Sequence, residues 1–232
     1  MMEELKGLSE LAARVSRGDA APEELIGLVD KIVAGSGGYE RETVASCLSA
    51  LETGGLLADP RVRERAVFGS GWRSSPVGLW LAAMLLDSSG GGEVAIEAWG
   101  RVIEREVGPS HEARFARARL WEREGHPAEA LADLKTAIDG PRSAAFLSKA
   151  AAAYSRIASR ATPPAVRRLR VALLSSSATE LSAPLLRLLC FRDGMDAEMY
   201  VGPFDGYRQD ILDPGSKLCA FSPDVVVIAT HW

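Results

Sequence analysis

The sequence is poor in cysteine, has no long apolar run and carries no excess of basic residues, and each absence excludes a class of protein. Its three cysteines, Cys47, Cys190 and Cys219, lie far apart without a C-x-x-C pair. We therefore predict buried thiols in a reducing compartment, the cytoplasm, and no zinc site or disulfide framework. No stretch approaches the roughly 18 apolar residues of a membrane span, and the charged N-terminus lacks the apolar core of a signal peptide. The net charge of −4 gives no reason to expect nucleic acid or an anionic membrane as a partner.

What the sequence does contain, up to about Arg160, is a series of amphipathic segments separated by glycine and proline. Proline at the first helical position and glycine just past the last one mark helix ends, as at Pro22 and Gly18. No segment of this part has the alternation of a strand. We predict helices at 2–17, 21–34, 39–52, 59–68, 75–87, 93–107, 110–125, 127–138 and 143–158.

Two of the predicted helical hairpins repeat each other at a fixed offset. The residues Ala83, Leu86, Gly90, Ala95, Trp99 and Val102 recur 35 positions later as Ala118, Trp121, Gly125, Ala130, Leu134 and Ala137. Small residues let the helices of a hairpin approach closely, glycine makes the turn, and large residues fill the groove. The spacing from Ala118 to Leu134 is similar to the skeleton of the tetratricopeptide repeat, although Arg117 stands where the repeat has a large apolar residue. The resemblance implies a tetratricopeptide-like array of α-helical hairpins.

Three tryptophans in this array, Trp80, Trp99 and Trp121, have two interpretations. They fill the core between helices, or they line an aromatic groove that binds a ligand. A helical array presents a concave surface and binds proteins more often than it performs chemistry. We therefore expect a protein partner on the array.

The composition changes at Pro163 and Pro164, which cannot continue a helix and stiffen the connection. We predict a helical domain at 1–160, a linker at 161–168 and a second, α/β domain at 169–232. The basic residues Arg167–Arg170 enter the first strand of that domain. They are interpreted as a solvated edge or as a phosphate-binding site.

The second domain has apolar runs typical of a parallel sheet. Strands are predicted at 169–175, 196–202 and 224–230, with a helix at 180–194. Right-handed crossovers favour the flavodoxin-like strand order 2-1-3. The run Val225–Ala229 is apolar enough for a strand in the middle of a sheet, yet only Thr230, His231 and Trp232 follow it. We expect a partial sheet with an exposed apolar edge, and self-association through that edge.

Ligands of such sheets bind at the carboxyl ends of the strands, beside the point where the connections change sides. The candidate ligand residues there are Ser175, Ser176 and Ser177 after the first strand, and Thr230, His231 and Trp232 after the third. Ser177 and Glu180 also form the sequence S-x-x-E, which is a capping box. The alternative role of the Ser177 hydroxyl is therefore to cap the helix that follows. The same helix N-terminus favours an anion or oxyanion.

The segment 170–229 is similar to the N-terminal α/β domain of FkbH-like proteins, the haloacid-dehalogenase subfamily IIIC. The resemblance is carried by YRQDILDP at Tyr207–Pro214 and by FSPDVV at Phe221–Val226. It implies an SGNH-like fold in a protein that moves a glyceryl unit from a phosphorylated donor onto an acyl carrier protein in polyketide biosynthesis. Aligned with the SGNH block G-D-S-x-T, the segment Ser175–Thr179 places Ser177 at the nucleophile and adds Thr179 to the site.

Other parts of the chemistry implied by this resemblance are missing. Serine replaces the glycine and aspartate of the SGNH block, and the Asp-x-x-His element that would activate the nucleophile is absent, because His231 follows the third strand. No D-x-D-x-[TV] phosphatase motif occurs, so no aspartyl nucleophile, magnesium site or cofactor is predicted. A serine without its base loses most of its activation. We expect a segment of a longer protein that binds an acyl carrier protein or another protein and is inactive alone; the alternative is a serine esterase or acyltransferase that uses Ser177.

Overall fold

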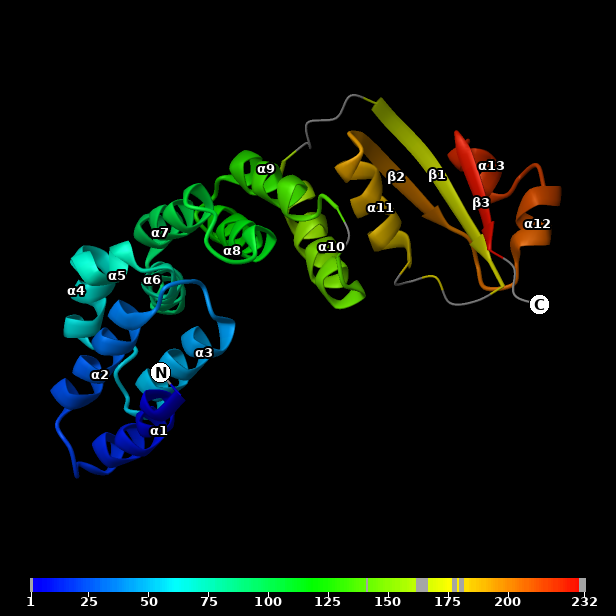
Figure 1. Cartoon of the computed structure of the whole chain (residues 1–232). Coiled ribbons are helices and arrows are strands. Elements are labelled where there is room, and N and C mark those ends of the chain that lie inside the picture. The colour runs from blue at the N-terminus through cyan, green and yellow to red at the C-terminus, as the bar shows by residue number, and fades with distance from the viewer. Residues whose placement is uncertain (1, 141, 162–166, 177–178, 180–181, 230–232) are drawn as a thin grey trace. The chain divides into compact units, whose positions relative to one another are not determined.

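The computed structural model describes residues 2–140, 142–161, 167–176, 179 and 182–229. These residues form thirteen helices and three strands. The chain divides into two compact units, Met1–Gly125 and His126–Trp232. The predicted class, a mostly helical chain with a small parallel sheet, is confirmed (Figure 1).

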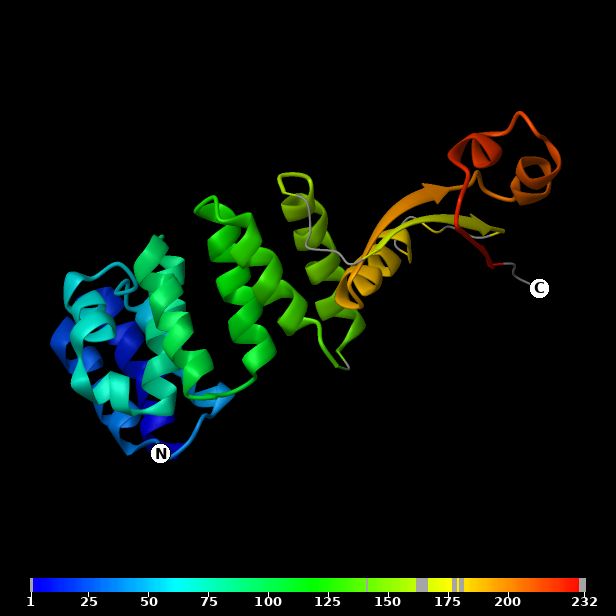
Figure 2. The ribbon, with the colours of Figure 1, turned by 90° about the horizontal axis from the view of Figure 1, so that it is seen from above.

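The first unit consists of helices only, and its helices lie side by side (Figure 2). Proline at the first position of α2, α4 and α6 confirms the predicted helix starts, and Asp59 caps α4 by accepting a hydrogen bond of 2.8 Å from the backbone N–H of Arg61. The short helix α5 was not predicted. The helices are α1 (Met2–Arg17), α2 (Pro22–Gly35), α3 (Arg41–Thr53), α4 (Pro60–Phe68), α5 (Ser70–Ser74), α6 (Pro76–Ser88), α7 (Gly92–Glu104) and α8 (Ser110–Arg123).

Helix α6 is the centre of this unit. Nine of its thirteen residues are buried, and it contacts α3, α4, α5 and α7. The indole rings of Trp80 and Trp99 meet edge to face with centroids 5.1 Å apart, and both residues are only 4% exposed. Trp80 and Trp99 are therefore core residues, as the first interpretation holds, and Trp121 is half-buried at the margin of the same core.

The positions that repeat at an offset of 35 occupy equivalent places in their helices. Of the first set, Ala83, Leu86, Ala95, Trp99 and Val102 are all buried, and so are Ala118, Ala130, Leu134 and Ala137 of the second. Gly90 and Gly125 each follow a helix with a positive φ, of 75° and 84°. The left-handed turn is the reason for glycine at both positions. The pattern therefore marks repeated burial and repeated turns, whereas a packed hairpin of α8 and α9 stays a prediction.

The second unit begins with two helices and continues with a three-stranded sheet. The strands are parallel and lie in the order β2-β1-β3, as predicted (Figure 1). The predicted linker at 161–168 falls largely outside the described residues, so that domain boundary stays a prediction. The elements are α9 (Pro127–Ala137), α10 (Ala144–Ala158), β1 (Arg167–Ser175), α11 (Ser182–Arg192), β2 (Met195–Val201), α12 (Tyr207–Leu212), α13 (Lys217–Phe221) and β3 (Val225–Ala229).

Helices cover part of both faces of the sheet. On one face Val171 and Ala197 pack against Cys190 of α11. On the other face Ala172 and Leu174 pack against Leu218 of α13. Successive residues of β1 thus point to opposite faces of the sheet and contribute to two small cores.

Helix α11 is held from its other side by α10. The rings of Tyr154 and Phe191 stack with centroids 4.6 Å apart and an interplanar angle of 24°. Both side chains are among the most buried of the chain. The pair therefore joins the helical beginning of this unit to the helix that covers the sheet.

Strand β3 lies at the edge of the sheet and is exposed along its whole length. Every residue from Val225 to Ala229 is exposed. Among the described residues no strand pairs with the outer side of β3, so whether the run lies in the middle of a larger sheet stays a prediction. The expected exposed apolar edge is present.

The cysteines differ in their surroundings. Cys47 and Cys190 are buried, as predicted, but the prediction is wrong for Cys219, which is exposed. Cys219 lies in the five-residue helix α13, of which only Leu218 is buried. Burial raises the pKa of the Cys47 thiol to about 11.

Candidate functional site

The sheet brings the carboxyl ends of β1 and β3 together, as the strand order requires. Ser175 lies opposite Ala229 in the register. The hydroxyl of Ser175 donates to the carbonyl oxygen of Ala229 at 2.9 Å, and the backbone N–H of Ser176 donates to the same oxygen at 3.2 Å. Ser175 is buried and its hydroxyl joins the two strands, which is a structural use of that side chain.

Thr179 precedes helix α11 and is buried. Its carbonyl oxygen accepts hydrogen bonds from the backbone N–H groups of Ser182 at 2.9 Å and Ala183 at 3.1 Å. Thr179 therefore helps to begin the helix through its backbone. Four of the predicted site residues, namely Ser177, Thr230, His231 and Trp232, lie outside the described residues, as does Glu180 of the predicted capping box.

The loop after β2 also reaches this end of the sheet, which the sequence did not predict. The backbone N–H of Gly202 donates to the carbonyl oxygen of Leu173 at 2.9 Å, and that of Asp205 donates to the carbonyl oxygen of Ser175 at 3.1 Å. Asp205 adopts a positive φ of 52°, which is uncommon for a residue with a side chain. Asp205 is thus a carboxyl-bearing residue whose backbone meets the end of β1.

Residues of the segment that carries the FkbH-like resemblance make hydrogen bonds that stabilise the fold. Tyr200 of β2 donates its hydroxyl to Asp210 at 2.8 Å, and the hydroxyl of Ser216 donates to the carbonyl oxygen of Asp210 at 2.7 Å. Partial burial and the bond to Asp210 raise the pKa of Tyr200 to about 12. The carboxylate of Asp213 accepts from the backbone N–H of Gly215 at 2.8 Å. These contacts hold α12 and its turn against the sheet.

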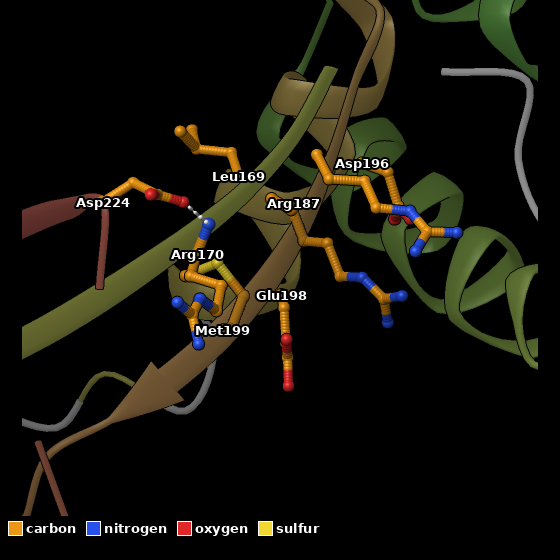
Figure 3. Close-up of a pocket in the computed structure, with 9 residues that line it drawn as sticks. Leu169, Arg170, Arg187, Asp196, Glu198, Met199 and Asp224 are labelled. Carbon is orange, nitrogen blue, oxygen red and sulfur yellow. Dashed lines mark hydrogen bonds between the residues drawn. The ribbon is translucent and has the colours of Figure 1, made fainter. Parts of the chain in front are cut away.

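A depression of about 690 Å³ lies at the opposite, amino-terminal end of the strands. Figure 3 shows arginine and carboxylate side chains from β1, β2 and α11 around it. In the register, Arg168 lies opposite Asp196 and Arg170 opposite Glu198, so charges of opposite sign alternate on one face. Three arginines and three carboxylates line this surface, which is therefore a mixed, solvated charge surface and not the predicted ligand site.

A second hollow, of about 340 Å³, lies in the first unit between α3, α6 and α8. We call it the helical groove. Its apolar part is formed by Tyr39, Val44, Leu48, Trp80 and Met84, and its polar part by Arg41, Ser49, Glu52 and Glu112. The ring of Tyr39 lies 4.9 Å from that of Trp80.

The rim of the helical groove is closed by an ion pair between Arg41 at the start of α3 and Glu112 at the start of α8. The contact with Glu112 raises the pKa of Arg41. Trp80 thus belongs to the core and also forms part of the floor of the groove, while ligand binding there stays a prediction. No local pattern in the sequence joins Tyr39 and Arg41 to the distant Glu112, so these groove residues could not be predicted.

Two further classes of site have no support in the part of the chain that the structure describes. No group of three or more histidine, cysteine, aspartate or glutamate side chains is arranged there to hold a metal ion. None of the described helices has the length and apolar character needed to cross a bilayer. Comparison with family models, with curated proteins and with solved structures finds nothing that matches this chain.

Proposed function

We propose that this chain is a protein-interaction part of an FkbH-like protein, and that its helical groove docks a partner polypeptide, an acyl carrier protein. The observation that carries the proposal is the helical groove itself, an apolar hollow with a polar rim on a helical unit. Clefts of this composition bind ligands through apolar contacts, while a few polar groups fix the orientation. The offset of 35 residues adds support, because arrays of helical hairpins present concave binding surfaces.

The groove has the dimensions and chemistry for the side chains of a docked segment. Its volume of about 340 Å³ is at the lower end of the range for binding pockets, roughly 300–1,000 Å³. Tyr39 and Met84 are half-buried, so each keeps a surface for a partner. Aromatic and methionine side chains are enriched at protein interfaces because they give a large contact area.

The contacts at the end of the sheet agree with a non-catalytic role. The hydroxyl of Ser175 donates its hydrogen bond to the carbonyl oxygen of Ala229. The contacts of Asp210 and Asp213, within the segment that carries the resemblance, hold turns and helices. The resemblance thus rests on residues that maintain the fold.

Titration calorimetry of the full chain with an acyl carrier protein tests the proposal. Leu48→Glu places a carboxylate in the groove and should weaken binding on the order of tenfold or more, since a buried unpaired charge is costly. Phe68→Glu is the matched control, because Phe68 lies on α4, does not line the groove and is 72% exposed. Absence of binding by any carrier protein, or equal loss in both variants, would contradict the proposal.

The alternative, an SGNH-type serine esterase or acyltransferase, depends on Ser177. It makes a distinct prediction, because a serine nucleophile is indispensable to covalent catalysis. Hydrolysis of a short-chain aryl ester by the purified chain is compared with that by Ser177→Ala. Equal rates remove Ser177 from any mechanism, whereas loss of activity in the variant would favour the esterase over a docking role alone.

A further inference from the structure

One side of the helical groove is a single face of α3. The residues of α3 that line the groove are spaced i, i+3, i+4, i+7, i+8 and i+11, namely Arg41, Val44, Ala45, Leu48, Ser49 and Glu52. This spacing follows one face of an α-helix through about three turns, or roughly 16 Å. Trp80 and Met84, one turn apart on α6, line the other side. The groove therefore runs along α3 for most of its length.

The middle of this face of α3 is accessible to a partner. Ala45 and Ser49 are exposed and lie one turn apart, while Leu48 and Met84 are half-buried. Side chains as small as alanine and serine let a second helix approach closely, at an interaxial distance of about 8–10 Å. A helix also satisfies its own backbone hydrogen bonds, whereas an extended chain would bury unpaired backbone groups against apolar side chains. The groove therefore suits a helix better than an extended segment.

The two ends of the groove differ in charge. At one end Arg41 and Glu112 pair with each other, so their charges compensate. At the other end the exposed carboxylate of Glu52 has no ion pair within the described part of the chain. Glu52 lies in the last turn of α3, which has no basic residue, so the negative end of the helix dipole adds to its charge. The Glu52 end of the groove therefore attracts a cation.

We propose that the element docked in the helical groove is an amphipathic helix of the partner, about three turns long, with a lysine or arginine at the end that meets Glu52. Its apolar residues recur at i, i+3 or i+4, and i+7, and pack on Leu48 and Met84. Its basic residue pairs with the carboxylate of Glu52. This inference rests on the proposed function, because it names the recognition element that the groove takes from its partner.

Synthetic helical peptides test the proposal without a carrier protein. Two peptides share an apolar stripe of leucines about three turns long. One has lysine at both ends and the other has glutamate, so that either orientation brings the charge to Glu52. A third peptide has the composition of the lysine peptide in an order without the stripe. Fluorescence anisotropy with the full chain measures each dissociation constant.

The wild-type chain should bind the lysine peptide on the order of tenfold more tightly than the glutamate peptide. This ratio should fall as salt is added, because the charges at the exposed end of the groove are screened. The peptide without the stripe should bind much more weakly than the lysine peptide. A wild-type chain that does not distinguish the lysine peptide from either of the others overturns the proposal.

A charge reversal in the groove gives the sharpest test. Glu52→Lys should reverse the preference in favour of the glutamate peptide, and a lysine in the last turn of α3 suits the helix dipole. A gain of affinity for the glutamate peptide cannot come from misfolding. Glu64→Lys is the matched control, because it makes the same change in net charge at an exposed position of α4 that does not line the groove. An equal effect of the two variants overturns the proposal.

The outcomes separate this proposal from the function on which it rests. Carrier-protein binding that is weakened in Leu48→Glu but unchanged in Glu52→Lys would keep the groove as a docking site and overturn the basic helix. Binding of the lysine peptide, reversed in Glu52→Lys, without binding of any carrier protein would support the helix and contradict the choice of partner. A chain that binds neither the peptides nor a carrier protein overturns both.

Discussion

Glycine 78 is the position at which the packing of α6 is most directly testable. A Cβ atom at Gly78 would lie 2.4 Å from the carbonyl oxygen of Trp72, 2.6 Å from the Cα of Trp72 and 2.8 Å from a methyl of Val33. The first two atoms belong to backbone and cannot rotate away. Gly78→Ala therefore forces α5 and α6 apart, although alanine is the better helix former.

The magnitude follows from two opposing effects. Replacing glycine by alanine within a helix stabilises by about 0.5–1 kcal/mol, whereas overpacking a close contact costs about 1–3 kcal/mol. We expect Gly78→Ala to destabilise the first unit by about 1–2 kcal/mol. Gly27→Ala in α2 is the matched control, because no atom lies within 4 Å of its added Cβ. That variant should stabilise the unit by about 0.5–1 kcal/mol.

Urea unfolding followed by tryptophan fluorescence measures both changes, since four of the five tryptophans, Trp72, Trp80, Trp99 and Trp121, lie in the first unit. The two variants should shift the transition in opposite directions. A Gly78→Ala chain as stable as the wild type or more so would refute the packing of α5 on α6. The same variant should weaken carrier-protein binding, because α6 bears Trp80 of the helical groove.

Three further predictions concern other parts of the chain. A thiol reagent should quickly label Cys219 of the native chain and leave the buried Cys47 unlabelled until the chain is unfolded. Rapid labelling of more than one thiol would contradict the burial of the others. Asp59→Ala should cost about 0.5–2 kcal/mol through loss of the α4 cap. The hydrogen bond from Arg61 lowers the pKa of Asp59 in the folded chain, so this stabilisation is present above the unfolded pKa and should fade as the pH falls through the folded pKa, as acid titrations of both chains would show. Phe191→Ala should destabilise the second unit by about 3–5 kcal/mol, measured by hydrogen exchange of α11, and unchanged exchange would contradict its packing on Tyr154.

The helices could be predicted because local residues determine where they begin and end. Pro22, Pro60 and Pro76 begin helices, and a left-handed glycine follows several of them, as at Gly194 after α11. Helix α5 was missed because five residues beside a glycine have no measurable period. The order β2-β1-β3 follows from the handedness of crossovers, which does not depend on the sequence.

The sites could not be predicted to the same extent. The helical groove depends on Tyr39, Arg41 and Glu112, and the last two are 71 positions apart. Only the packing of α3, α6 and α8 brings them together. The exposure of Val227 is likewise absent from the composition, because an apolar strand has the same sequence whether a neighbour covers it or not. Exposure is a property of the assembled sheet.

The proposed docking surface belongs to the first unit alone. The helical groove is a hollow whose ion pair and aromatic floor can select a partner by shape and charge. Val227→Lys, at an exposed position of β3 in the second unit, should thus leave carrier-protein binding intact, while Leu48→Glu should weaken it. Equal loss of binding in both variants would show that the assignment of binding to the groove is wrong.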